Sequence, residues 1–169
     1  MRRAKMYAFF LSLVLVLAFA WAASTYWLLP PRVFRKALLD PIPASVRRIG
    51  GTASNHGPGH MYVLRFDISE ADLQLILASD QFEEVGYAAC HGNRLVYGET
   101  QETARPWEFS GALPEMRPPH WCASADPNAL KAYVIEDIDV ESTGLLVRLL
   151  LYNQRIGQAY YVEYDGGGT

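Results

Sequence analysis

Apolar and polar positions follow three different patterns along the chain. Residues 6–29 form a run of 24 residues without a charged side chain, and a helix of that length can cross a hydrocarbon layer of about 30 Å. In residues 61–68, the apolar residues Tyr62, Leu64, Phe66 and Ile68 alternate with Val63, Arg65 and Asp67, which is the pattern of a strand with one buried face. Residues 71–79 place Leu and Ile on one helical face. The sequence therefore predicts a membrane helix followed by a mixed domain.

Local signals extend this prediction to an antiparallel sheet. Ser69 is placed to cap the helix at residues 71–79, and Glu70 adds negative charge to its first turn. Asn and Gly within residues 153–157 supply the positive φ angles of a tight turn, which makes the last two strands antiparallel. Further strands are expected at residues 87–91, 94–97, 132–138, 145–152 and 158–164. The predicted fold class is α+β, an antiparallel sheet packed by one main helix.

Breaker residues divide the chain into four parts. Residues 1–31 are a basic tip and the transmembrane helix, and residues 32–60 are rich in Pro and Gly, which predicts a tether and entry loop. Residues 61–165 form the α+β domain, whose size suits one hydrophobic core. Residues 166–169 are mostly glycine and predict a flexible tail.

Two interpretations of the N-terminal segment remain open. Trp21, Tyr26 and Trp27 are amphipathic rings near the end of the apolar run, where aromatic residues favour the headgroup level. The same segment contains small residues at Ala20 and Ala22 that suit signal-peptide cleavage, which would give a secreted protein. We favour a single-pass signal-anchor in the lipid bilayer, because the apolar run at residues 6–29 continues beyond these cleavage sites.

The charge distribution bounds both orientation and partners. Basic residues stand on both sides of the apolar run, with a small excess at the N-terminus, so we expect that end inside and the domain outside the cytoplasm. From residue 40 onward the chain carries nine basic and eighteen acidic residues, a net charge of −9. This acidity disfavours nucleic acid as a partner. A membrane or cell-envelope protein is the expected partner class.

The two cysteines have three competing interpretations, which are a disulfide, two buried free thiols or ligands of a zinc site. Export would place Cys90 and Cys122 in an oxidising compartment, which favours one disulfide. Each cysteine also has a histidine close by, His91 and His120, and these four side chains have the composition of a zinc site. Their spacing argues against zinc, because adjacent residues on a strand point to opposite faces.

The sequence contains no catalytic motif and no cofactor signature, and it predicts no metal site. His56 and His60 are expected to be exposed loop histidines, because residues 57–59 (Gly-Pro-Gly) prevent the helix that would place them on one face. The Pro-rich stretch at residues 98–121 predicts a long surface loop. Its aromatic residues Trp107, Phe109 and Trp121 border the face most suited to binding.

Two functional hypotheses follow from these patterns. The first is a non-catalytic, membrane-anchored protein whose acidic domain binds a partner protein or supports a membrane complex. The alternative is a small enzyme or metal-binding module that uses Cys90, His91, His120 and Cys122. The chain also resembles small envelope proteins in having an anchor, a Pro-rich stretch ending in Trp and a Tyr-rich closing hairpin, a resemblance that implies no activity.

Overall fold

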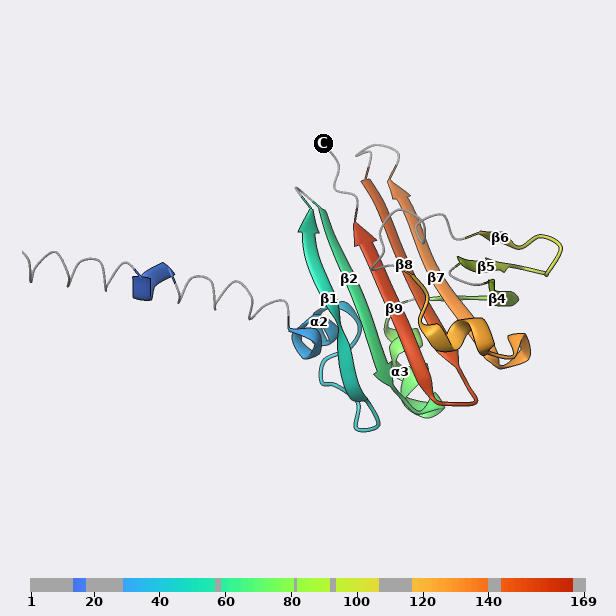
Figure 1. Cartoon of the computed structure of the whole chain (residues 1–169), viewed down its shortest axis with the longest axis horizontal. Coiled ribbons are helices and arrows are strands. Elements are labelled where there is room, and N and C mark those ends of the chain that lie inside the picture. Colours follow the sequence, from blue (N-terminus) through green and yellow to red (C-terminus); the bar gives the residue numbers. More distant parts are fainter. Residues whose placement is uncertain are drawn as a thin grey trace, which may run out of the picture.

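A six-stranded antiparallel sheet forms the centre of the protein in a computed structural model (Figure 1). The structure describes residues 14–17, 29–56, 59–80, 82–91, 94–106, 117–139 and 144–165. The strand order is β1-β2-β9-β8-β7-β3, and all neighbours run antiparallel. The strands are β1 (Arg47–His56), β2 (Gly59–Asp67), β9 (Gln158–Asp165), β8 (Gly144–Asn153), β7 (Leu130–Asp139) and β3 (Glu83–Val85).

Each face of this sheet is covered by a different layer (Figure 1). Helices α2 (Pro30–Ala37) and α3 (Glu70–Asp80) pack on one face, which we call the helix face. The opposite face carries a three-stranded sheet and two 3-10 turns. These elements are β4 (Tyr87–His91), β5 (Arg94–Gly98), β6 (Arg105–Pro106), η3 (His120–Ser124) and η4 (Pro127–Ala129). The domain therefore has two cores, one on each side of the large sheet.

The predicted strands and helix are confirmed, but burial extends further than the pattern indicates. Strand β2 buries Leu64 and Phe66 on the helix face, and it also buries Met61 and Val63 on the opposite face. An alternating strand has one polar face only where that face meets water. Helix α3 begins as expected, because the backbone N–H of Asp72 donates to the Ser69 hydroxyl at 3.3 Å.

The region from residue 30 to 56 differs from the predicted tether. Pro30 and Pro31 begin α2, whose Val33 and Phe34 are buried in the core of the helix face. Strand β1 then runs through Gly50 and Gly51, which the sequence suggests are breakers. Proline is tolerated in the first turn of a helix, where its missing N–H has no partner to lose. The domain therefore starts at residue 30 rather than near residue 61.

The predicted membrane helix at residues 6–29 lies outside the described residues, apart from residues 14–17 and 29. Within the described part of the chain, no helix has both the length and the hydropathy needed to cross a membrane. The tail at residues 166–169 also lies outside it.

Candidate functional site

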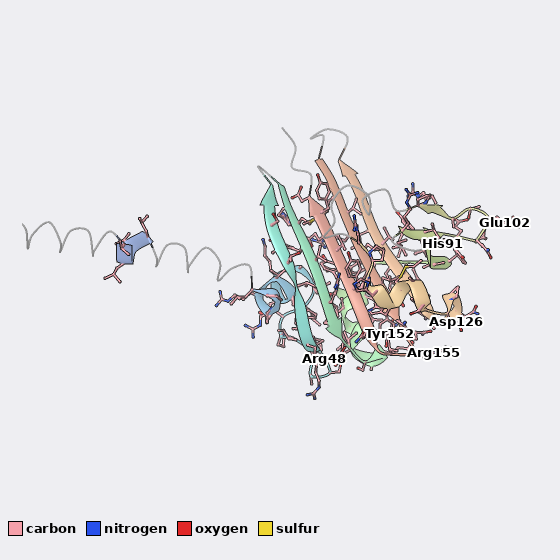
Figure 2. The ribbon with its side chains drawn as sticks, viewed as in Figure 1. Arg48, His91, Glu102, Asp126, Tyr152 and Arg155 are labelled. Atoms are coloured by element: carbon pink, nitrogen blue, oxygen red, sulfur yellow. A yellow bond between two sulfur atoms is a disulfide. The ribbon has the colours of Figure 1, made fainter. Side chains whose placement is uncertain are left out.

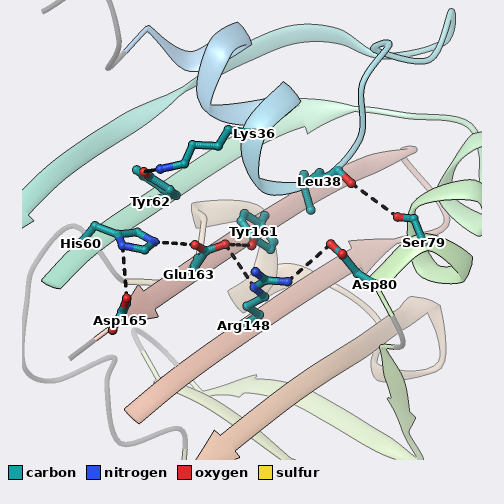
Figure 3. Close-up of polar contacts among 10 residues, drawn as sticks. All are labelled: Lys36, Leu38, His60, Tyr62, Ser79, Asp80, Arg148, Tyr161, Glu163 and Asp165. Atoms are coloured by element: carbon teal, nitrogen blue, oxygen red, sulfur yellow. Dashed lines mark hydrogen bonds and ion pairs between the residues drawn. The ribbon is translucent and has the colours of Figure 1, made fainter. Parts of the chain in front are cut away.

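A buried carboxylate, Glu163, lies at the centre of a polar network on the helix face (Figure 3). Its Oε1 lies 2.6 Å from Nε2 of His60, and its Oε2 accepts a hydrogen bond from the Tyr161 hydroxyl. The Arg148 Nε lies 3.3 Å from the same Oε2. The Nδ1 atom of His60 lies 3.5 Å from Oδ2 of Asp165, so the imidazole lies between two carboxylates. Because Glu163 is only 4% exposed, these contacts replace its lost hydration.

The network extends through Arg148 to the end of α3. Nη1 of Arg148 lies 3.7 Å from Oδ2 of Asp80, a distance for an ion pair rather than a hydrogen bond. The Asp80 Oδ2 atom is buried and has no hydrogen-bond partner among the described residues. Burial raises the pKa of Asp80, Arg148 opposes that shift, and the charge of Glu163 adds to it. Asp80 is therefore the least satisfied carboxylate of the network.

Two further contacts tie α2 and the segment after it to the rest of this face (Figure 3). Lys36 Nζ donates to the Tyr62 hydroxyl at 2.9 Å, and this bond raises the pKa of Lys36. The Ser79 hydroxyl lies 3.5 Å from the carbonyl oxygen of Leu38 and 2.8 Å from that of Ile76. The network thus links both helices to the sheet, and each of its carboxylates lies beside a basic side chain. We interpret it as a structural clasp between layers, because burial raises the pKa of Tyr161 and leaves its hydroxyl a poor base or nucleophile.

The opposite face contains the disulfide that the sequence predicts. Cys90 on β4 and Cys122 on η3 are bonded, with their Cα atoms 5.5 Å apart. Both sulfurs are therefore unavailable as thiolate ligands or nucleophiles. His91 and His120 are exposed, and the described residues contain no group of three or more His, Cys, Asp or Glu side chains that could hold a metal.

One member of the predicted binding face lies in a cavity. Trp121 is half-buried and lines a cavity of about 320 Å³ on the sheet side of η3, together with its neighbour His120. Arg48 of β1 and Arg65 of β2 line the same space, and Figure 2 places Arg48 near the start of β1. We call this space the Trp121 cavity. Trp107 and Phe109, the other predicted members, lie outside the described residues.

A second cavity, of about 580 Å³, opens where β3 and β7 meet the small sheet. Carboxylates dominate its lining, in contrast with the Trp121 cavity. They belong to Asp80, Glu83, Glu84 and Glu99, and Arg105 is also present. Asp80, whose Oδ2 atom is buried, connects this cavity to the clasp on the helix face.

The two edges of the large sheet differ strongly. Strand β3 is three residues long and includes the exposed Glu83 and Glu84. Strand β1 is ten residues long, and residues 50–54 within it carry no charge. Short, charged edges protect a sheet against pairing with other chains, whereas a long uncharged edge offers free backbone groups. Among the described residues, β1 pairs only with β2.

Sequence reasoning missed most of these groups. His60 is a partner of Glu163 rather than an exposed loop histidine, because β2 begins at Gly59 and places His60 on the helix face with Tyr62. Arg48 and Arg65 had no detectable signal, since they converge only after β1 and β2 pair.

Comparison with known proteins found no match to this chain among family models, curated proteins or solved structures. The class that the fold defines is a small antiparallel α+β domain with one disulfide.

Proposed function

We propose that the chain is a single-pass, membrane-anchored protein whose acidic extracytoplasmic domain binds a partner protein without catalysis. The apolar run at residues 6–29 supplies the anchor, because burying that many neutral side chains in lipid outweighs their exposure to water. Helix α2 follows this run directly and is fixed in the core by Val33 and Phe34. Because no linker separates the apolar run from α2, the domain would be held close to the membrane surface.

The single observation that carries partner binding is the uncharged stretch of edge strand β1 at residues 50–54. An extended segment of another protein can add to such an edge through main-chain hydrogen bonds, which need no particular side chain on β1. The glycine at position 50 is consistent with the addition of such a strand to β1. A Cβ at Gly50 would meet no atom within 4 Å, so packing inside the domain does not require a glycine there, and glycine in a strand often marks the close approach of another backbone.

The anchor is tested first and separately. Carbonate extraction of membranes should leave the full-length chain in the pellet, and its intact mass should still include residues 1–29. Recovery of a shorter chain beginning after Ala20 or Ala22 would support signal-peptide cleavage and secretion instead. Protease added to intact cells should degrade the domain if it lies outside the cytoplasm.

The binding edge is tested by photo-crosslinking in native membranes. A photoreactive amino acid at Thr52 of β1 should capture a discrete partner, which mass spectrometry can identify. The same group at Glu84 of β3 is the matched control, since both positions are exposed and lie on opposite sheet edges. A Thr52→Lys change should abolish capture by a reporter elsewhere on β1, because an added lysine protects an edge strand. Equal capture at Glu84 would remove the case for β1.

A further inference from the structure

The Trp121 cavity carries positive charge in a domain that is otherwise acidic. Its charged lining consists of the guanidinium groups of Arg48 and Arg65 and one carboxylate, Asp67, with the imidazole of His120 beside them. From position 40 onward the chain has nine basic and eighteen acidic residues. A local excess of cations in such a domain indicates that this cavity is suited to an anion.

The single carboxylate of this cavity is already fully engaged. Asp67 Oδ2 accepts a hydrogen bond from Nε of Arg48, and Asp67 Oδ1 accepts one from Nε2 of Gln158 at 3.2 Å. Only the Nε of Arg48 is used in this pair, so its two terminal nitrogens can serve a ligand. The Arg48 side chain is 74% exposed, and the backbone at this residue has φ 52°. That conformation belongs to a β-bulge, a feature that redirects a side chain out of the regular ladder.

Arg65 supplies the charge that Asp67 does not neutralise. Its guanidinium lies 5.8 Å from the ring centre of Tyr160, the residue opposite it on β9. Stacking on an aromatic ring orients a guanidinium without using its hydrogen-bond donors. No carboxylate is paired with Arg65 among the described residues, so its donors can take part in bidentate recognition.

We infer that the Trp121 cavity binds a carboxylate attached to a planar apolar group. The carboxylate would be held by Arg65 and the terminal nitrogens of Arg48, and the apolar group would lie against the half-buried Trp121. A singly charged carboxylate suits this site better than a phosphate dianion, because Asp67 in the wall repels the second negative charge. This inference does not depend on strand addition at β1.

The test uses the isotope-labelled full-length chain in detergent micelles, titrated with benzoate and observed by NMR. The indole N–H signal of Trp121, assigned by its loss in Trp121→Phe, should shift saturably with benzoate. It should respond at least tenfold more weakly to benzamide, which has the same ring without the charge. Raising the ionic strength should weaken benzoate binding.

Three variants separate recognition from folding. Arg65→Gln should weaken benzoate binding at least tenfold, whereas Arg94→Gln, an exposed arginine on β5, should leave it unchanged. Asp67→Asn should strengthen binding of both benzoate and phenyl phosphate, with the larger gain for phenyl phosphate, and a gain of affinity cannot arise from unfolding. Equal binding of benzoate and benzamide, or unchanged affinity in Arg65→Gln, would overturn the inference.

The source of the carboxylate is distinguished by a second pair of probes. The tripeptide Ala-Ala-Phe with a free C-terminus is compared with its amidated form. Tighter binding of the free tripeptide than of benzoate would support the inference and assign the carboxylate to a protein C-terminus. Tighter binding of benzoate would support it with a small molecule as the source. Binding of the amidated tripeptide as tight as that of the free form would contradict it.

Discussion

On the helix face, α2 and α3 are fastened to the sheet by hydrogen bonds and ion pairs around the buried Glu163. On the opposite face, the small sheet is fastened to η3 by the disulfide between Cys90 and Cys122. Polar and ionic contacts therefore attach the helices to the large sheet, whereas a covalent bond attaches η3 to the small sheet. Consequently the helix face should respond to pH and charge substitutions, and the opposite face should respond to reductant. This division also separates the side of the domain that carries α2 from the side that contains the Trp121 cavity.

The largest effect is expected from Glu163→Ala. Removing this carboxylate leaves the buried parts of His60 and Arg148 without their shared partner, and breaking a buried pair from one side costs about 3 to 5 kcal/mol. We expect a loss within this range, although Arg148 keeps its contact with Asp80. Urea-dependent pulse proteolysis of the full-length chain measures the free energy of unfolding.

Glu163→Gln is the matched control for this prediction. It keeps the size of the side chain and one hydrogen-bond acceptor, so it should lose less stability than Glu163→Ala while removing the charge. An equal loss for both variants would show that charge dominates, and no loss in either would contradict the clasp.

The next largest effect is expected on the opposite face. The Cys90–Cys122 disulfide closes a loop with a sequence separation of 32 residues, for which the chain-entropy relation gives about 3 to 4 kcal/mol. Reduction, or a Cys90→Ser/Cys122→Ser double change, should lower the free energy of unfolding by that amount. The same urea assay with and without reductant measures it. The double variant should be insensitive to reductant, and a response there would contradict the assignment.

Part of this architecture could be predicted from the sequence and part could not. The alternating residues of β2 and the capping Ser69 of α3 are local signals, and the structure confirms both. Strand β1 was missed because Gly50 and Gly51 indicate a turn. In the strand, Gly51 has φ 147° and a Cβ there would overlap the carbonyl oxygen of Val63, so the glycine permits close pairing with β2. A residue that usually ends a strand is here required within one.

The sites illustrate the same limit at longer range. The cysteines could be paired by counting, since two cysteines allow only one intramolecular disulfide. His60 and Glu163 are 103 positions apart and meet only because β2 and β9 are neighbours in the sheet. Sequence separation of that kind leaves no spacing rule, so the clasp could not be predicted. Trp121 could be identified as a binding residue from its residue type. The presence of Arg48 and Arg65 in the same cavity could be recognised only from the register of β1 and β2.

A smaller effect is expected at one tyrosine on each face. Tyr133 on the helix face and Tyr160 on the opposite face have buried hydroxyls without a hydrogen-bond partner among the described residues. Burial raises the pKa of Tyr133 to about 12. Because an unpaired buried hydroxyl is costly, Tyr→Phe at either position should leave stability unchanged or raise it by up to about 1 kcal/mol. A loss of more than about 1 kcal/mol would show that the hydroxyl has a hydrogen-bond partner. The urea assay measures this difference in the free energy of unfolding.

The smallest effect, and the sharpest comparison, lies at the two ends of α3. The pKa of Asp80 is raised, mainly by burial, and the pKa of Asp72 is lowered, mainly by its hydrogen bond with Ser45. A raised folded-state pKa gives stability that is present below the unfolded value of 3.8 and lost as pH rises through the folded value. A lowered pKa gives stability that is present above 3.8 and lost as pH falls through the folded value.

Substitution by Asn at each position should therefore give pH dependences of opposite sign. Asp80→Asn should be at least as stable as the unmodified chain at pH 7, within about 1 kcal/mol because the side chain is a quarter exposed, and this advantage should disappear near pH 4. Asp72→Asn should be less stable at pH 7, with the deficit shrinking below pH 4. Parallel unfolding curves at both pH values measure the two differences. If Asp80→Asn loses stability at pH 7, attraction to Arg148 outweighs desolvation, and the clasp is then an attractive ion-pair chain along its whole length.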